Sequence, residues 1–258
     1  MVISTQSYQP YRHSIFDPPL LLSPLLLFVH FIFSLTFYRF VTEMSSEQKP
    51  ILYSYWRSSC SWRVRTALAL KNIDYEYKTV DLLSEKAKNQ LKSINPAAKV
   101  PAYVVNGQVI SESLAIIEYL DETHPDVPLL PKNPVKRAHA RAIALLVTSG
   151  IQPLHNLKVL QLLNKKEAGF GGQFAKQFIV EGLTALEVLL KEHSGKYAVG
   201  DTITIADLAI PPLIYSANRF NLDLSAYPTV NRINETLAEI PAFIAAHPDN
   251  QPDTGLNA

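Results

Sequence analysis

The chain has 258 residues, of which 47% are hydrophobic and 18% are charged, and its formal net charge at pH 7 is +1. This length allows one or two domains with a sizeable core. Basic and acidic residues are nearly equal in number, whereas nucleic-acid-binding proteins typically have an excess of basic residues, so the charge gives no argument for a nucleic-acid partner. Cys60 is the only cysteine. It therefore excludes an intramolecular disulfide, a cysteine-based metal site and a C-x-x-C redox pair, and we predict no metal site.

The first 43 residues differ from the rest of the chain. Residues 18–38 carry no formal charge and are numerous enough to cross a bilayer. Arg12 and Arg39 flank this run on both sides, so its charges indicate no orientation. Because a sequence typical of the start of a soluble protein follows Met44, we expect residues 1–43 to be dispensable or untranslated and the protein to be cytoplasmic. A membrane anchor or an organelle-targeting segment is the alternative.

Strands and helices alternate along residues 48–131, which is typical of an α/β domain. Short alternating runs predict strands and longer runs of helix-forming residues predict helices. Asn106-Gly107 predicts a hairpin turn between two strands. The elements expected in chain order are strand 51–55, helix 62–71, strand 74–80, helix 84–94, strands 100–105 and 109–110, and helix 111–122. The predicted order is βαβαββα.

Three serines and the thiol lie at the turn between the first strand and the first helix, where residues 57–65 read R-S-S-C-S-W-R-V-R. A helix N-terminus carries unpaired N–H groups and the positive end of the helix dipole, so it favours an anion, a thiolate included. Serines at such a place usually cap the helix, and a lone cysteine is more often a packing residue. The pattern alone therefore leaves both interpretations open.

A second helix N-terminus follows the fourth strand, at Glu112 and Ser113. Ser113 suits a carboxylate and Glu112 suits an ammonium group, although both are also common in a first helical turn. Pro101 opens the third predicted strand, where its missing N–H is tolerated. If its peptide bond is cis, the backbone of Val100 is available to an extended peptide, but sequence alone leaves cis and trans open.

The remainder of the chain is predicted to be helical. Four prolines between residues 125 and 134 indicate a stiff linker, and we place an all-α domain at residues 136–258. A helical stretch over 135–163 is expected to break near Gly150 and Pro153. Apolar residues at helical spacing between Phe174 and Leu190 predict a buried stripe. Thr204-Ile205-Ala206-Asp207 is a capping-box sequence, which we assign to folding rather than catalysis. Further helices are predicted over 207–218 and 228–240.

These pieces together resemble the zeta class of glutathione transferases, the maleylacetoacetate isomerases. The most specific string is S-S-C-S-W-R-V-R at residues 58–65; N-P at 95–96, V-P at 100–101, E-S-L-A-I-I-E-Y-L at 112–120 and G-I-Q-P-L-H-N-L at 150–157 also match. The resemblance runs from about Lys49 to the C-terminus. It implies an N-terminal thioredoxin-like βαβαββα domain with a cis Pro101, followed by an all-helical C-terminal domain, so an α/β plus all-α glutathione transferase fold.

The resemblance also implies roles for matching residues. Ser58 would hydrogen-bond the sulfur of glutathione, and Cys60 would assist in the same pocket. Val100 would pair with the glutathione backbone, Glu112 and Ser113 would hold its γ-glutamyl end, and Arg219 would bind a substrate carboxylate. The family often has glutamine at the Glu112 position and near Lys86. The other implied glutathione-binding residues are Ser59, Ser61, Trp62, Arg63, Lys86, Gln152, Asn156, Leu157 and Lys158, the last four partly across a dimer interface.

The implied activity is the glutathione-dependent conversion of maleylacetoacetate to fumarylacetoacetate in phenylalanine and tyrosine breakdown. The substrate is a small dicarboxylate, which suits arginines such as Arg63 and Arg219. The implied partners are glutathione as cofactor and a second copy of the chain; we expect no nucleic acid, and membrane contact only if residues 1–43 are retained. The alternatives are a transferase that conjugates or dehalogenates small α-halo acids, a monothiol redox enzyme acting through Cys60, and a non-catalytic scaffold.

Overall fold

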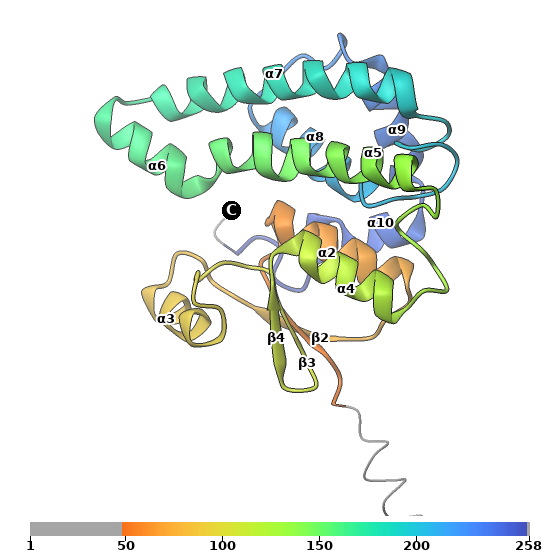
Figure 1. Ribbon diagram of the computed structural model, residues 1–258. Coiled ribbons are helices and arrows are strands. Elements are labelled where there is room, and N and C mark those ends of the chain that lie inside the picture. The colour runs from red at the N-terminus through yellow and green to blue at the C-terminus, as the bar shows by residue number, and fades with distance from the viewer. Residues whose placement is uncertain (1–47, 257–258) are drawn as a thin grey trace, which may run out of the picture. The chain divides into compact units, whose positions relative to one another are not determined.

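In the computed structural model, which describes residues 48–256, the first part of the chain forms a four-stranded mixed sheet (Figure 1). The strands are β1 (Ile51–Ser54), β2 (Glu76–Thr79), β3 (Ala102–Val105) and β4 (Gln108–Ser111), in the order β2-β1-β3-β4. β1 pairs parallel with β2 and antiparallel with β3, and β3 pairs antiparallel with β4. The helices between them are α2 (Ser59–Leu70), α3 (Glu85–Ile94) and α4 (Ser113–Thr123). The predicted βαβαββα order is confirmed, and the predicted apolar segment over residues 1–43 lies outside the described residues.

Helix α2 is the central element of this part. Its residues 61–68 are all buried, as expected for a helix covered on every side. It packs beside α4 above the sheet and also contacts α8 (Ile210–Arg219) and α10 (Pro241–Ala246) of the helical part (Figure 1). Val64 and Leu68 of α2 join Leu52 of β1 and Ile117 of α4 in one buried cluster. Residues at the start of α2 are therefore held between the sheet and the helices that follow.

Two backbone features predicted from the sequence are present around β3 and β4. Asn106 and Gly107 have φ values of 49° and 73°, which is the pair of positive angles that a type I′ hairpin requires. The Val100–Pro101 peptide bond is cis, as the family resemblance implied. The hairpin turn joins β3 to β4, and Val100 lies two residues before the start of β3 at Ala102.

All the regular elements that follow are helical within the described residues. The helix expected over 135–163 does break near Gly150 and Pro153, where a π-helical turn passes into a 3₁₀ turn. The helix expected over 207–218 begins as a 3₁₀ turn and continues to Arg219, one residue further than predicted. The elements are α5 (Pro134–Leu145), η1 (Leu146–Ile151), η2 (Gln152–His155), α6 (Leu157–Lys166), α7 (Phe170–His193), η3 (Asp207–Ala209), α8 (Ile210–Arg219), α9 (Pro228–Ala238), α10 (Pro241–Ala246) and η4 (Pro248–Asn250).

Asp207 has the folding role expected of a capping box. Its Oδ2 accepts hydrogen bonds from the Thr204 N–H at 2.8 Å and the Thr204 hydroxyl at 3.0 Å, while Oδ1 accepts from the Ala198 N–H at 2.8 Å. Asp207 is completely buried, and burial raises the pKa of its carboxyl to about 6. These bonds join the start of η3 to the segment after α7. Within residues 48–256, no helix is long and apolar enough to span a membrane.

Candidate active site

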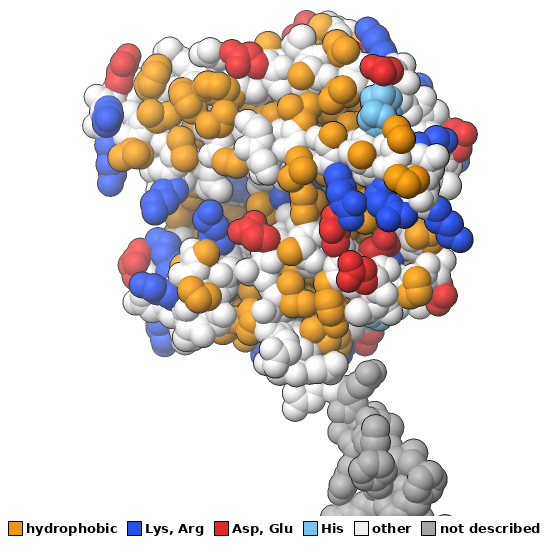
Figure 2. Space-filling view, viewed as in Figure 1, with side chains coloured by type: hydrophobic (Ala, Val, Ile, Leu, Met, Phe, Trp, Pro, Cys, Tyr) orange, Lys and Arg blue, Asp and Glu red, His pale blue; other side chains and the backbone are white. Residues whose placement is uncertain are grey.

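A cleft of about 990 Å³ lies between the sheet-containing part and the helical part. Its walls come from the loop before α2, the loop before β3, the start of α4, the segment from η2 into α6, and the end of α8. On the face shown in Figure 2, basic side chains gather between the positions of α3 and α6. The lining includes Ser58, Ser59, Cys60, Val100, Glu112, Ser113, Gln152, Asn156, Leu157, Lys158 and Arg219. Most of the predicted site residues are thus brought to one cleft.

Helix α2 begins at Ser59, three residues before the predicted start at Trp62. Ser58 is its N-cap, and the Ser58 hydroxyl oxygen accepts a hydrogen bond from the Ser61 N–H at 3.2 Å. The string of serines therefore forms the first helical turn instead of a loop. Because a hydroxyl that accepts a hydrogen bond still carries its own proton, Ser58 both caps the helix and keeps an O–H donor for the cleft. The capping and ligand-binding interpretations are compatible.

Four side chains form a hydrogen-bonded chain between the two helix N-termini. The Gln152 Nε2 donates to the Cys60 Sγ at 3.0 Å. The Arg63 Nη1 donates to the Gln152 Oε1 at 2.6 Å, and its Nη2 and Nε donate to the Ser113 Oγ at 2.9 and 3.3 Å. Arg63 is only 2% exposed. Its guanidinium therefore orients Ser113 and Gln152, rather than reaching into the cleft as we expected of an arginine for a dianionic substrate.

The backbone at the second helix N-terminus is unusual. Glu112 has φ 67° and ψ 119°, precedes α4 and makes no side-chain capping bond to it. A positive φ costs a non-glycine residue about 1–3 kcal/mol and is found most often at binding sites. Glu112 is exposed and lines the cleft, whereas the adjacent Ser113 is buried. The two neighbours thus present a carboxylate and a hydroxyl at different depths.

The helical part contributes to the cleft within the same chain. Gln152, Asn156, Leu157 and Lys158 all line it, and Gln152 contacts Cys60 directly. The resemblance had placed these residues partly across a dimer interface. Arg219 also lines the cleft, and burial and the nearby positive charge of Arg57 lower the pKa of its guanidinium.

Besides Arg63, three more predicted residues lie outside the cleft lining. Ser61 and Trp62 are buried in α2 and are not part of the cleft lining; Trp62 packs edge-on against His247 at a ring distance of 5.0 Å. Lys86 is exposed on α3 and also lies outside the lining, to which Lys88 of the same helix belongs. Residues two apart on a helix point in different directions. The sequence position of Lys86 therefore does not indicate that Lys88, and not Lys86, lines the cleft.

His155 is a cleft residue that the sequence reasoning missed. It lines the cleft, and its Nε2 atom is buried with no hydrogen-bond partner among the described residues. Burial, with a smaller contribution from the charge of Arg219, lowers the pKa of its imidazole to about 4, so the ring is neutral at pH 7. His155 belongs to the string G-I-Q-P-L-H-N-L at residues 150–157. Roles were predicted only for other residues of that string, among them its glutamine and asparagine. Arg57, Lys88 and Lys99 also line the cleft without having been predicted.

Comparison with known proteins places both parts of the chain in one family. Residues 57–123 match the family model for the glutathione S-transferase N-terminal domain, and residues 155–247 match the one for the C-terminal domain. A probable maleylacetoacetate isomerase of Caenorhabditis elegans is 88% identical over 213 residues, which are 83% of this chain and 100% of that protein.

Two solved structures extend the similarity to the fold. The holo structure of a maleyl pyruvate isomerase, a bacterial glutathione S-transferase in the zeta class, is 37% identical with a TM-score of 0.76, and the match covers 80% of this chain and 100% of that one. A maleylacetoacetate isomerase from Methylobacterium extorquens AM1, with malonate and glutathione bound, is 36% identical with a TM-score of 0.76, and covers 79% of this chain and 99% of that one.

Proposed function

Because the chain belongs to the zeta class of the glutathione S-transferase family, we propose that it is a maleylacetoacetate isomerase that uses glutathione as its cofactor. The substrate is maleylacetoacetate, a small dicarboxylate, and the product is its trans isomer, fumarylacetoacetate. The reaction belongs to phenylalanine and tyrosine breakdown. The observation that carries the proposal is Ser58, which caps α2 with its oxygen and keeps its O–H donor at the wall of the cleft.

The donors and acceptors around the cleft suit glutathione. Its γ-glutamyl end carries an ammonium and a carboxylate, for which Glu112 and the Ser113 hydroxyl at the N-terminus of α4 supply opposite partners. Val100 lines the same cleft, where its backbone would pair with the glutathione backbone. A volume of about 990 Å³ is at the upper end for small-molecule sites, so it has room for a second small molecule beside a tripeptide.

When bound, glutathione supplies the thiolate that adds reversibly to the cis double bond and so allows rotation. The Ser58 hydroxyl would donate a hydrogen bond to the sulfur and so stabilise its ionised form. Lowering a thiol pKa by two units requires about 2.7 kcal/mol. One charge-assisted hydrogen bond provides about 1.5–3 kcal/mol, and a helix N-terminus adds about 0.3–1 kcal/mol. Ser58 and α2 are therefore sufficient without a general base.

The substrate's carboxylates meet the positive wall of the cleft. Arg219 and Arg57 lie close enough for each charge to act on the other, and both line the cleft. Two positive charges at short range repel each other, and a dianion bound beside both would offset this repulsion. Arg219 accordingly binds one carboxylate and Arg57 assists. Cys60 would assist beside the sulfur of bound glutathione, and the hydrogen bond from Gln152 orients its side chain.

The test uses glutathione-dependent loss of maleylacetone absorbance with the full chain. Wild-type protein is expected to turn over without net consumption of glutathione. Ser58→Ala should lower kcat about 10- to 100-fold, the equivalent of one charge-assisted hydrogen bond. Ser59→Ala is the matched control, because Ser59 is the next hydroxyl in the same turn, and it should change kcat much less. An unchanged rate in Ser58→Ala would remove Ser58 from the central role.

Two competing activities are separated by simple assays. If conjugation or dehalogenation of α-halo acids is the main reaction, the specificity constant for dichloroacetate exceeds that for maleylacetone. If Cys60 is the nucleophile of a redox enzyme, Cys60→Ala loses all activity. In an isomerase, Cys60→Ala keeps most of its turnover, because Ser58 is still in place.

We further propose that the protein is a cytoplasmic homodimer and that residues 1–43 are unnecessary for catalysis. Val109 of β4 and Val135 and Leu145 of α5 are exposed apolar residues, which is consistent with a subunit contact. Light scattering should give twice the chain mass of 28.8 kDa.

Protein started at Met44 should keep full kcat, and fluorescent fusions of the full-length and shortened proteins should have the same distribution in the cell. A full-length fusion confined to a membrane would instead support the anchor.

A further inference from the structure

The C-terminal segment (residues 248–256) returns to the loop that leads into α2. The Asp253 Oδ2 accepts a hydrogen bond from the backbone N–H of Trp56 at 3.0 Å, and its Oδ1 accepts from the Tyr77 hydroxyl at 2.6 Å. The carbonyl oxygen of Leu256 accepts from the Trp56 indole N–H at 2.7 Å and from the Tyr55 hydroxyl at 3.0 Å. The end of the chain therefore binds Tyr55 and Trp56, which immediately follow β1.

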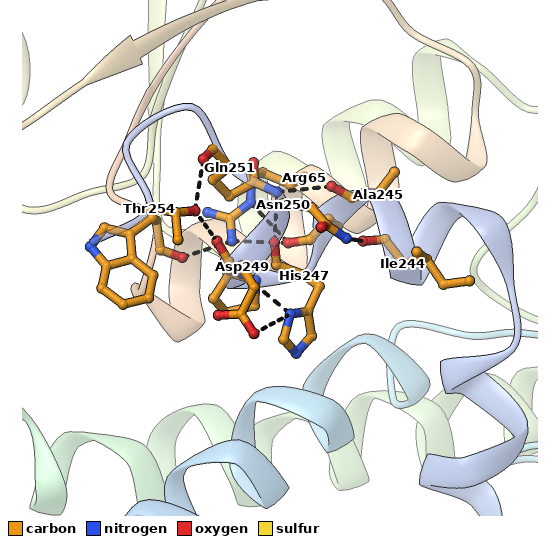
Figure 3. Close-up of polar contacts among 11 residues, drawn as sticks. Arg65, Ile244, Ala245, His247, Asp249, Asn250, Gln251 and Thr254 are labelled. Carbon is orange, nitrogen blue, oxygen red and sulfur yellow. Dashed lines mark hydrogen bonds and ion pairs between the residues drawn. The ribbon is translucent and has the colours of Figure 1, made fainter. Parts of the chain in front are cut away.

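The other side of the same loop is held by Arg65 of α2. Its Nη1 donates to the Tyr55 carbonyl at 3.3 Å and its Nη2 to the Trp56 carbonyl at 3.0 Å. Its Nε and Nη2 also donate to the Ala246 carbonyl at the end of α10. Figure 3 shows this guanidinium among the residues of the C-terminal segment and α10. Arg65 thus binds the loop carbonyls, while Asp253 binds the loop N–H.

The loop fixed in this way ends at Ser58. The Ser58 N–H donates to the Tyr55 carbonyl at 3.0 Å, which is the same oxygen that Arg65 binds. Tyr55 and Arg57 line the cleft beside Ser58, whereas Trp56 is buried between them and Asp253 is only 9% exposed. One buried hydrogen bond therefore connects the Asp253 carboxylate to the backbone of Trp56, two residues before Ser58.

The C-terminal segment also has the internal bonds that make it a defined support. The Gln251 Nε2 donates to the carbonyls of Ala245 and His247, both at 2.8 Å. The Thr254 hydroxyl is within 2.7 Å of the carbonyls of Pro248 and Gln251. These bonds hold Asp253 in a turn anchored to α10, so its carboxylate approaches Trp56 from a fixed position.

We propose that Asp253 is a positioning residue for the reaction: by holding the Trp56 N–H, it places the Ser58 hydroxyl at the distance from the glutathione sulfur that keeps the thiol ionised. The inference rests on the proposed function of Ser58. It differs from a purely structural role because it predicts a change in the ionisation of bound thiol, which is measurable without turnover.

The experiment compares full-length wild type with Asp253→Ala, Asp253→Asn and Asp249→Ala. Three quantities are measured: kcat and KM with maleylacetone, the dissociation constant of glutathione, and the pH dependence of the ultraviolet absorbance of bound thiolate. Asp249→Ala is the matched control, since Asp249 is an exposed carboxylate of the same segment, bonded to His247, and it should behave like wild type.

Asp253→Ala is expected to raise the apparent pKa of the bound thiol by about one unit, which is a tenfold change in its ionisation equilibrium. At a pH below the thiol pKa of both proteins the thiolate fraction, and with it kcat, should fall about tenfold, and nearer neutral pH about threefold. The dissociation constant of glutathione should change less than about threefold, because Ser113 and Glu112 remain in place. Asp253→Asn keeps an oxygen acceptor but loses the charge, and charged acceptors form about twice as strong hydrogen bonds. It should therefore show smaller changes in the same direction.

Unaltered kcat and thiol ionisation in Asp253→Ala would overturn the inference, even if its melting temperature fell. If Asp253→Ala does not fold, Asp253→Asn decides: a wild-type pH profile in that variant overturns the inference, and a partial shift supports it. Wild-type protein that neither binds glutathione nor isomerises maleylacetone would refute the proposed function itself, which is a different result from normal turnover in every variant.

Discussion

Arg63 and Arg65 are two residues apart in helix α2, and both are buried, at 2% and 1% exposure. Their hydrogen-bond partners nevertheless belong to different classes. Arg63 binds the side chains of Ser113 and Gln152, which come from the starts of α4 and η2. Arg65 binds mainly main-chain carbonyls, of Tyr55, Trp56 and Ala246, together with the Ser54 hydroxyl. One helix thus serves two networks on two sides.

The difference shows how a buried charge acquires its role. A guanidinium has five N–H donors and no acceptor, so each arginine here satisfies several acceptors in a dry environment. Burial lowers the pKa of Arg65, yet the group stays charged because its normal pKa is so high. The acceptors of Arg63 are side chains that can also bind a ligand, so its hydrogen bonds influence the cleft. The acceptors of Arg65 are mainly main-chain carbonyls, so its hydrogen bonds fix the conformation of the backbone.

The largest predicted effect follows from replacing Arg65. Arg65→Leu leaves the carbonyls of Tyr55, Trp56 and Ala246 buried without this donor, and the free energy of unfolding should fall by about 3–5 kcal/mol. Arg63→Leu is the matched control, with a smaller loss because its partners are side chains that can reorient. Urea-unfolding midpoints at an unchanged slope would measure both. Equal losses in the two variants would contradict the division into two networks.

A second prediction concerns pH and His155, which lies on the same turn, η2, as the Arg63 partner Gln152. The folded protein keeps this imidazole neutral to about pH 4, whereas an unfolded histidine gains a proton below about pH 6.5. The unfolded state therefore binds more protons as pH falls, and stability should decrease between about pH 6.5 and 4 by at most about 3 kcal/mol. In His155→Gln this decrease should disappear.

The measurement is the difference in unfolding free energy between wild type and His155→Gln at several pH values. Asp207 acts in the opposite direction, because its pKa is raised to about 6, so the folded state takes up a proton before the unfolded state does. Since Asp207 is present in both proteins, its contribution cancels in the difference. Parallel curves across this pH range would show that His155 is protonated as easily in the fold as outside it.

The third prediction tests the Arg63 network through binding. Arg63→Leu removes the donor that orients Ser113 and Gln152, and the dissociation constant of glutathione should rise about tenfold, equivalent to about 1.4 kcal/mol. Calorimetric titration measures this directly. Arg65→Lys provides the comparison, since it keeps a charge at the other network and should change the affinity much less. An Arg63→Leu protein with normal affinity would make Arg63 a structural residue like Arg65.

The sequence predicted the order of the elements because each depends on local signals. The Asn106-Gly107 hairpin, the break at Gly150 and Pro153, and the Thr204–Asp207 capping box are all produced by residues within a few positions of one another. Most of the predicted site residues also line the cleft, since they sit in short strings that are mainly at helix starts. The helix boundary at Ser59 was missed because a serine suits the cap and the first turn equally.

The remaining features depend on contacts between distant residues. Asp253 meets Trp56 across 197 positions, and nothing in the sequence near either residue indicates that contact. The burial of Arg63 and Arg65 was not predicted either, because the string W-R-V-R contains no information about which distant elements pack against it. Whether an arginine faces a ligand or the protein is decided by helices α4, α8 and α10, which cover α2 from other parts of the chain.

The smallest predicted effect applies the same argument to two lysines at the surface. Lys86 falls near a glutathione-binding position that is often glutamine in the family, and it lies outside the cleft lining, whereas Lys99 was not predicted and lines it. An exposed charge contributes at most about 1 kcal/mol, so Lys99→Ala should raise the KM for glutathione about two- to fivefold. Lys86→Ala should leave it within measurement error. If Lys86→Ala had the larger effect, the family position would outweigh the geometry, and the roles inferred for Arg63 and Arg65 from their partners would lose their support.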